Sequence, residues 1–560
     1  MLIYSIVFLI MSNAVNNRRD SSILYSRIAI LILITCIILQ SINYNISYIL
    51  NGLILYNGLI YINNYLIFFM LFIFILTISI LSINSFFTIK TVNFRKSFLH
   101  IKNLRINNQN NIEEKNSNIK SLDYNVDSMS EQFRIIEYPL IILFCISGAI
   151  FLMLSFDIVS IFLSIELQSY ALYLICSIYR NSESSVSAGL TYFLLGGLSS
   201  CIILLGISLL YVNSGSTNLE NFYMINNIYD MIIYNMFYID NNTINTIINV
   251  DNNFSSIFTQ YIYLQISLVI MSIGFLFKIA AAPFHFWSPD VYDAVPTIVT
   301  TFVAIIPKIS IIIFLYKLLY FTYSDLIYSS WVNNIIISSI LSLIIGSILG
   351  LTQYRIKRLY AYSTISHIGF ILLGLSINNL ESSKAMFFYI IQYSFSNLNA
   401  FLLLIAIAYT LKNYILDNKN FNVKDYNYSP IQYISQLKGY FNINPLLATS
   451  LSITLFSFAG LPPLIGFFGK QMILTASINN GFIFITIIAI LTSVISAVYY
   501  LIIIKMIFFE KSNYITSNNT IYKEKITVSS NFSFLISILT LIITFFIFFD
   551  NEIFKLLNII

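Results

Sequence analysis

Four charged residues lie inside long apolar segments of this chain. Lys278 and Lys308 belong to KIAAAPFHFWSPDVYDAVPTIVTTFVAIIPKIS, which holds four of the nine prolines, whereas Glu166 lies in FLSIELQSYALYLI and Lys470 in LIGFFGKQMIL. A charged side chain at the bilayer centre costs roughly 2.5–3.5 kcal/mol even on insertion scales, so such residues usually mark an ion pathway. Loss of water shifts the pKa of such groups toward values at which they exchange protons. We interpret the four residues as a candidate proton path.

The histidines and two further lysines are interpreted separately. His367, in YAYSTISHIGF, falls in an apolar segment, and we interpret it as a relay because histidine titrates near neutrality. For His285, beside the prolines, a structural hydrogen bond and proton transfer are equally open. His100 lies in a basic polar segment, where we expect it to be solvated. Lys317 and Lys505 approach polar segments, so we expect their ammonium groups to reach the membrane interface.

The short segment after the first prolines has the residue types of a helix start. We expect Trp287, Asp290 and Asp293 to cap or brace a short helix there. Ser288 and Asp290 are N-cap types, and Pro289 suits a first turn.

Motifs for enzyme chemistry are absent from the sequence. It contains no phosphate-binding glycine loop, dinucleotide fingerprint or nucleophile elbow. The cysteines occur singly, without metal-ligand spacing, so we expect packing roles for them and neither a metal nor a disulfide framework. We therefore expect no cofactor in this chain. The cysteines are Cys36, Cys145, Cys176 and Cys201.

The composition predicts the elements that hold these residues. Apolar residues make up 58% of the chain and charged residues 9%, against about a quarter charged in soluble domains. Apolar windows of helix-spanning length recur, which predicts an all-α polytopic membrane protein with about fourteen transmembrane helices. No basic residue precedes the first apolar run, so we expect a retained helix there and no signal peptide. Expected spans include 1–15, 22–40, 64–88, 138–155, 156–177, 187–212, 261–282, 297–320 and 331–350, with 47–62 too polar to count.

The charges of the polar segments predict the orientation. Lys90 to Arg134 carries eight basic and five acidic residues, whereas Asn213 to Gln260 carries acids only. Basic segments stay on the cytoplasm-like side, so we expect these two segments on opposite sides, with the N-terminus opposite Lys90. The polar segments at Gln353–Arg358, Lys412–Lys438 and Lys511–Lys525 should return to the basic side. Heavy use of Phe, Tyr, Ile and Asn favours an AT-rich organellar gene. In a mitochondrion the basic, cytoplasm-like side is the matrix.

A short internal match predicts an inverted repeat. Leu276–Pro283 (LFKIAAAP) resembles Leu455–Pro462 (LFSFAGLP) after a shift of 179 residues. Five predicted spans separate the two helices, so the copies would run in opposite directions, as in inverted-repeat transporters. We predict two five-helix repeats, 138–320 with a helix broken near 283 and 331–509 with a helix broken near 462. The N-terminal helices and basic loop of 1–137 precede them, and a last helix at 531–549 follows.

Three long motifs resemble the subunit 2 family of mitochondrially encoded NADH:ubiquinone oxidoreductase, respiratory complex I. They are Phe277–Ser310, Tyr354–Leu375 and Leu437–Leu474, and the resemblance extends over about 138–510. Complex I subunits 4 and 5 and multisubunit cation/proton antiporters share the broken-helix plan. Their sequence after the first break differs from WSPDVYDAVPTIVTTF.

The resemblance implies roles for individual residues. Proton-translocating members use a glutamate on the fifth helix and lysines on the sixth, seventh, eighth and twelfth. Glu166 matches the glutamate, and Lys278, Lys308 and Lys470 match the seventh, eighth and twelfth positions. Where the family often has AGLKYFLLGA, this chain reads AGLTYFLLGG, so Thr191 replaces the sixth-helix lysine. We expect Glu166 to be protonated at rest or to pair with Lys278.

The resemblance also implies a function. We expect a proton-translocating antiporter-like subunit of complex I in the mitochondrial inner membrane, part of an NADH:ubiquinone reductase but without a redox site of its own. Its partners would be other membrane-arm subunits, including neighbouring antiporter-like subunits, and lipids, but no nucleic acid. Two alternatives stay open, namely a free-standing cation/proton antiporter subunit and an assembly scaffold with an inactive channel.

Overall fold

The computed structural model describes residues 1–15, 22–44, 52–83, 89–90, 137–179, 182–238, 251–322, 330–416, 431–511, 526–527 and 530–548. Helices dominate these ranges. They are α1 (Leu2–Val15), α2 (Ser22–Tyr44), α3 (Asn64–Ile83), α6 (Glu137–Leu154), α7 (Ile158–Ser177), α8 (Glu183–Ser214), α9 (Leu219–Tyr238), α10 (Asp251–Ile279), α11 (Trp287–Ala294), α12 (Thr297–Thr322), α13 (Ser330–Leu351), α14 (Ile356–Ile377), α15 (Leu380–Leu416), α16 (Pro445–Ala459), α17 (Ile465–Asn479), α18 (Ile483–Phe508) and α19 (Ser530–Phe545), with short 3-10 turns at η5 (Ile434–Leu437), η6 (Tyr440–Asn442) and η7 (Phe546–Phe548).

The few strands form two short antiparallel pairs. Strands β1 (Leu53–Leu55) and β2 (Ile60–Ile62) pair antiparallel, with Leu53 opposite Ile62, in the stretch that is too polar for a span. Strands β3 (Ile89–Lys90) and β4 (Ile526–Thr527) also pair antiparallel. The second pair joins two segments that are far apart in sequence, and both adjoin predicted basic loops.

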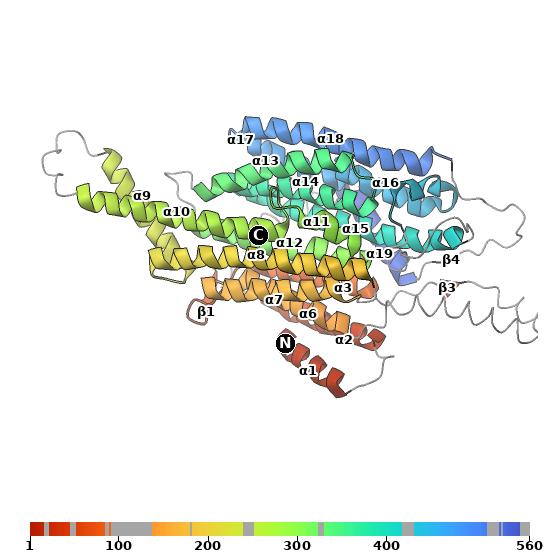
Figure 1. Cartoon of the computed structure of the whole chain (residues 1–560), viewed down its shortest axis with the longest axis horizontal. Helices are drawn as coiled ribbons and strands as arrows, with labels where there is room; N and C mark the ends of the chain where they lie inside the picture. Colours follow the sequence, from red (N-terminus) through yellow and green to blue (C-terminus); the bar gives the residue numbers. More distant parts are fainter. Residues whose placement is uncertain are drawn as a thin grey trace, which may run out of the picture.

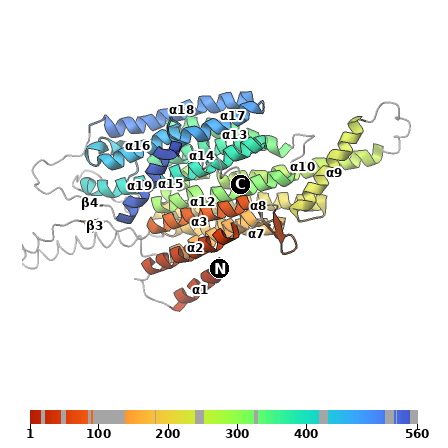
Figure 2. The same cartoon turned by 180° about the vertical axis from the view of Figure 1, so that it is seen from behind.

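The long helices lie side by side in one bundle, with α1 at one edge and α18 at the other (Figures 1 and 2). Among the described residues, eleven helices are long and apolar enough to cross a membrane, and three shorter apolar segments accompany them. The predicted all-α, multi-pass membrane fold is confirmed. The total of fourteen spans and the division into inverted repeats stay predictions.

The two ends of the bundle carry different segments. Helix α9 and the start of α10 project from one end, whereas β3 and β4 lie at the other (Figures 1 and 2). The acidic segment and the start of the Lys90 segment are therefore on opposite ends, as their charges predict. Residues 91–134, which include His100, lie outside the described residues, as do Arg180, Lys523 and Lys525.

Two of the predicted path residues, Lys308 and His367, lie on the most buried helices. The membrane-length windows of α12, α14 and α15 are 100%, 94% and 89% buried, against 28% for α8 and 39% for α18. A helix that is apolar on all sides and fully enclosed belongs to the centre of a bundle. Helices α12 and α14 carry Lys308 and His367, so these two groups are screened from lipid by neighbouring helices.

Helices are interrupted at both proline-rich places. Helix α10 ends at Ile279, and α11 begins only at Trp287, whose Nε1 donates to the Phe277 carbonyl across the gap at 2.9 Å. Helix α16 ends at Ala459, and Gly460 follows in the left-handed conformation with φ of 84°. The Gly460 N–H donates to carbonyls of the last turn, which closes α16 in the manner of a glycine C-cap.

Candidate functional site

An ion pair joins the first two predicted path residues. Lys278 on α10 donates from Nζ to Glu166 Oε1 on α7 at 3.1 Å. The two side chains are 7% and 14% exposed. Of the two states expected for Glu166, the structure contains the one in which it pairs with Lys278.

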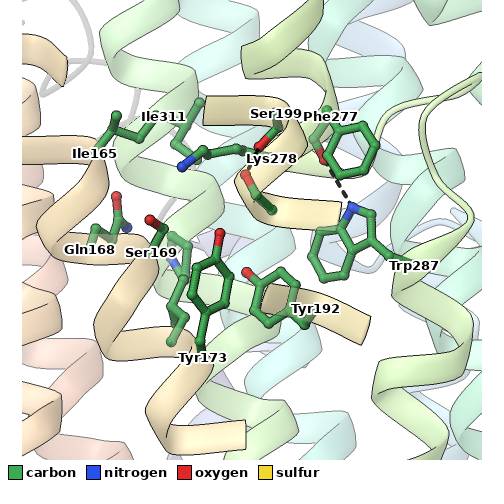
Figure 3. Close-up of a pocket in the computed structure, with 13 residues that line it drawn as sticks. Ile165, Gln168, Ser169, Tyr173, Tyr192, Ser199, Phe277, Lys278, Trp287 and Ile311 are labelled. Carbon is green, nitrogen blue, oxygen red and sulfur yellow. Dashed lines mark hydrogen bonds between the residues drawn. The ribbon is translucent and has the colours of Figure 1, made fainter. Parts of the chain in front are cut away.

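A small cavity adjoins this ion pair. The volume that the centre of a water molecule can occupy is about 20 Å³. This is enough for one or two water molecules. Figure 3 shows Gln168 and Ser169 at one side of the view, Trp287 at the other, and Lys278, Tyr173 and Tyr192 between them. Most of the wall is apolar, but Gln168, Ser169 and Tyr173 supply polar atoms that can hold a water molecule beside the buried lysine.

A glycine makes room for the cavity wall. A Cβ atom on Gly196 would overlap the Tyr173 hydroxyl, whereas one on Gly197 would have no heavy atom within 4 Å. Helix α8 therefore admits the tyrosine hydroxyl only because residue 196 has no side chain.

A side-chain amide links the cavity wall to the helix of the second lysine. Gln168 lines the cavity and donates from Nε2 to the Ser310 hydroxyl at 2.9 Å. Ser310 is two residues after Lys308 on α12. Lys308 is 2% exposed, and its Nζ donates to the Thr364 hydroxyl of α14 at 3.1 Å and lies 5.6 Å from the centre of the Tyr292 ring. A hydrogen bond between an amide and a hydroxyl therefore joins the cavity wall to α12, the helix that carries Lys308.

The predicted relay histidine is buried on α14, where it contacts α15 and α16. His367 is 3% exposed, and its Nδ1 lies 2.7 Å from the Tyr389 hydroxyl of α15. Its ring packs on Phe458 of α16, with centroids 5.3 Å apart. The structure thus brings His367 to the edge of the second broken helix.

Lys470 binds the end of that broken helix. It is 8% exposed, and its Nζ donates to the carbonyls of Phe458 and Ala459 at 2.9 and 3.0 Å. The last carbonyls of a helix lack partners within the helix and favour a cation. A Cβ on Gly460 would lie 2.9 Å from Lys470 Cδ. The glycine that ends α16 therefore also leaves space for the lysine.

The expectation that Lys317 reaches the membrane interface is wrong. Its side chain is fully buried, and Nζ donates to the carbonyls of Met153, Leu154 and Ser155 at the end of α6, at 3.3, 3.2 and 2.7 Å. All three ammonium protons are used, so this lysine closes a helix end. Lys505, by contrast, is exposed in the last turn of α18, as expected.

Of the two roles expected for Trp287, Asp290 and Asp293, which were to cap or to brace α11, the structure shows bracing and no side-chain cap. The N-cap position is Phe286, with no side-chain cap, and the Ser288 hydroxyl donates to the preceding His285 carbonyl at 3.1 Å. Asp290 and Asp293 instead form ion pairs with the start of α14. These contacts brace the short helix from the side, and they involve Arg358 with Asp290 at 2.9 Å, and Arg355 and Arg358 with Asp293 at 2.5 and 3.2 Å.

Two further residues, Thr191 and Cys201, differ from their expected surroundings, whereas His285 does not. Thr191 is exposed on α8, and its hydroxyl donates to the Ala188 carbonyl at 3.0 Å. Cys201 is exposed, whereas Cys36, Cys145 and Cys176 are buried, so a packing role fits only these three. His285 is buried, and its Nδ1 has no hydrogen-bond partner among the described residues, so both of its interpretations stay open.

The sequence did not point to Lys357 or Tyr389. Lys357 counted only as a basic loop charge, yet it is 2% exposed and donates from Nζ to the Val295 carbonyl at 2.7 Å. Tyr389 lies in an apolar stretch with several other tyrosines. Only the contact with His367 distinguishes it, and nothing in its sequence neighbourhood reveals that contact.

Comparison with known proteins assigns the family. Residues 155–496 match the family described as NADH:quinone oxidoreductase/Mrp antiporter, transmembrane. The chain belongs to this family. It is 46% identical over 429 residues to NADH-ubiquinone oxidoreductase chain 2 of Rhizopus oryzae, with 73% of this chain and 75% of that protein covered. It is 34% identical over 398 residues to NADH-quinone oxidoreductase subunit N of Pelagibacter ubique, with 71% and 74% covered.

Structural comparison gives the same result for the fold. A chain of respiratory complex I from Thermus thermophilus superimposes with a TM-score of 0.63 at 20% identity, and the match covers 96% of both chains. The predicted resemblance to complex I subunit 2 is therefore confirmed. The matched region of the NADH:quinone oxidoreductase/Mrp antiporter family contains Glu166, Lys278, Lys308, His367 and Lys470.

Proposed function

We propose that this chain is a proton-translocating, antiporter-like core subunit of respiratory complex I. The observation that carries the proposal is a set of buried ionisable groups that extends from one broken helix to the other. Buried charge of this kind inside membrane helices is retained where ions or protons move. Relatives named as NADH-ubiquinone oxidoreductase chain 2 support the assignment to complex I.

Each lysine of the path has a different partner in the resting arrangement. Lys278 is paired with a carboxylate, Lys308 with a hydroxyl and Lys470 with two helix-end carbonyls. Opening the pair between Glu166 and Lys278 would leave a buried ammonium without its counter-charge, which favours release of its proton. A change at this pair therefore alters the proton affinity of the first lysine in the row.

The energy required is compatible with such a change. Moving one proton against 100 mV requires about 2.3 kcal/mol, and one pKa unit corresponds to about 1.4 kcal/mol. A change of under two units in proton affinity is enough. Breaking one buried ion pair and forming another is an event of this size.

The remaining assignments follow from the charges and from the family. We place the chain in the mitochondrial inner membrane, with the basic segments in the matrix and the N-terminus on the intermembrane-space side. Its partners would be other membrane-arm subunits. Electron transfer would take place in other subunits, so that no cofactor binds to this chain.

Replacing both central lysines tests the path. In assembled complex, Lys278→Met with Lys308→Met should lower the number of protons pumped per NADH oxidised. Lys505→Met is the matched control, because that lysine is exposed at the end of α18. Full pumping by the double variant, in complex that assembles normally, would refute the assigned path.

The same variants distinguish the alternatives. Variants that assemble normally but pump less exclude an assembly scaffold with an inactive channel. Purification of the chain in a large redox assembly, and not alone, excludes a free-standing cation/proton antiporter.

A further inference from the structure

A buried histidine and a buried tyrosine are joined near the middle of the candidate path. The Nδ1 atom of His367 on α14 lies 2.7 Å from the hydroxyl oxygen of Tyr389 on α15. The two residues are 3% and 0% exposed. One nitrogen of the imidazole therefore has a fixed partner in a region that bulk water does not reach.

The His367 imidazole lies between the hydrogen-bond partners of Lys308 and those of Lys470. Thr364, one turn before His367, accepts a hydrogen bond from Lys308 at 3.1 Å. On the other side, Phe458 packs on the imidazole, and its carbonyl accepts a hydrogen bond from Lys470 at 2.9 Å. A proton that passes from one lysine to the other has this imidazole on its way.

The second nitrogen of the imidazole ring, Nε2, is free to exchange a proton. Nε2 of His367 is buried and has no hydrogen-bond partner within the part of the chain that the structure describes. A neutral imidazole has one donor and one acceptor nitrogen. Buried donors without partners are rarer than buried acceptors without partners. We therefore assign the hydrogen to Nδ1, which donates to Tyr389, and the lone pair to Nε2.

We propose that Tyr389 is a positioning residue that holds the His367 imidazole so that Nε2 exchanges the transported proton. An N–H bond of the Lys308 ammonium breaks, and a new N–H bond forms at Nε2. The imidazolium then gives this proton to the unprotonated amine of Lys470. Nδ1–H donates to the Tyr389 oxygen throughout. This role rests on the proposed proton path.

A hydroxyl suits this position better than a carboxylate. A neutral oxygen accepts the Nδ1 hydrogen both when the ring is neutral and when it is charged. A carboxylate would hold the imidazolium as an ion pair and oppose release of the proton. The aromatic ring of Tyr389 is fixed separately, because it stacks on Phe370 with centroids 5.8 Å apart.

Other titratable groups surround this part of α14, but among the described residues only Tyr389 forms a hydrogen bond with the His367 ring. The ring of Tyr393 also lies 6.0 Å from the imidazole, yet its hydroxyl donates to the Ala304 carbonyl at 3.1 Å. The lysines act on the imidazole through their charge. The groups are Lys308 on α12, Lys470 on α17, Tyr292 on α11, Tyr389 and Tyr393 on α15, and Tyr499 and Tyr500 on α18.

The substitution Tyr389→Phe tests the proposal, because it removes the hydroxyl and keeps the ring. Tyr360→Phe is the matched control. Tyr360 is fully buried on α14 and packs on Phe458, and its hydroxyl has no partner among the described residues. Proton-pumping rate per assembled complex is measured across pH. Loss of one hydrogen bond to a charged ring should slow pumping about tenfold in Tyr389→Phe and move its pH profile about one unit toward acid. The control should match the wild type.

Three outcomes separate this proposal from the proposed function. Equal rates and pH profiles for Tyr389→Phe and Tyr360→Phe overturn the role of Tyr389. If Tyr389→Phe assembles poorly, His367→Gln tests the same exchange, and normal pumping by that variant overturns the proposal. Lys308→Met is measured alongside. Full pumping by Lys308→Met overturns the proton path itself, whereas its loss with a normal Tyr389→Phe overturns only the positioning role.

Discussion

Replacing Lys317 with methionine should destabilise the protein, because this buried lysine closes the end of α6. Its Nζ donates to three carbonyls at 2.7, 3.2 and 3.3 Å. A hydrogen bond from a charged donor contributes about 1.5–3 kcal/mol, but three bonds from one group do not add. Methionine also removes the cost of burying the charge, which offsets part of the loss. We expect the free energy of unfolding to fall by about 2–4 kcal/mol.

Thermal inactivation of the assembled complex measures this loss. The Lys317→Met variant should lose activity at a lower temperature than the wild type. The molecules that remain folded should keep a normal proton-to-electron ratio. Lys308→Met is the matched control on the same helix. That lysine has one hydroxyl partner, so its loss should reduce pumping and change thermal stability little. Wild-type thermal stability of Lys317→Met, or a loss of pumping at unchanged stability, would refute a structural role for Lys317.

Three other substitutions test particular contacts. Gly196→Ala should lower stability by about 1–3 kcal/mol, because its methyl group would overlap a tyrosine hydroxyl at the cavity wall. Gly197→Ala, which meets open space, should be neutral in the same thermal assay. Asp293→Asn should reduce the amount of assembled complex more than Asp290→Asn, because Asp293 is 8% exposed between two arginines and Asp290 is 71% exposed. Thr191→Lys should leave the pumping ratio unchanged, since this side chain is exposed on α8; a changed ratio would place it in the path.

The spans and their interruptions were predictable because they depend on local properties. Hydropathy over a window of helix length predicts a helix wherever the chain occurs in a membrane. Proline lacks the N–H that continues a helix, so Pro283 and Pro462 predict interruptions without knowledge of the neighbouring helices. The path lysines and Glu166 were recognisable for a similar reason, because charge inside an apolar segment is unusual in any fold.

The partners of these charges were not predictable. Lys308 and Lys317 are both lysines of one apolar helix, and sequence spacing does not reveal that one meets a hydroxyl and the other meets a helix end. Asp290 and Asp293 have the residue types of a helix cap, but their carboxylates pair with arginines more than 60 positions later in the chain.

The sequence by itself determined the membrane fold, both helix interruptions and the burial of Glu166 and the three path lysines, because each depends on hydropathy, proline or charge within one segment. Only the tertiary structure decided what those residues do for one another. It paired Glu166 with Lys278, placed Lys470 on the end of α16 and joined His367 to Tyr389. These contacts depend on how helices far apart in sequence pack, and the geometry of that packing is a property of the whole bundle.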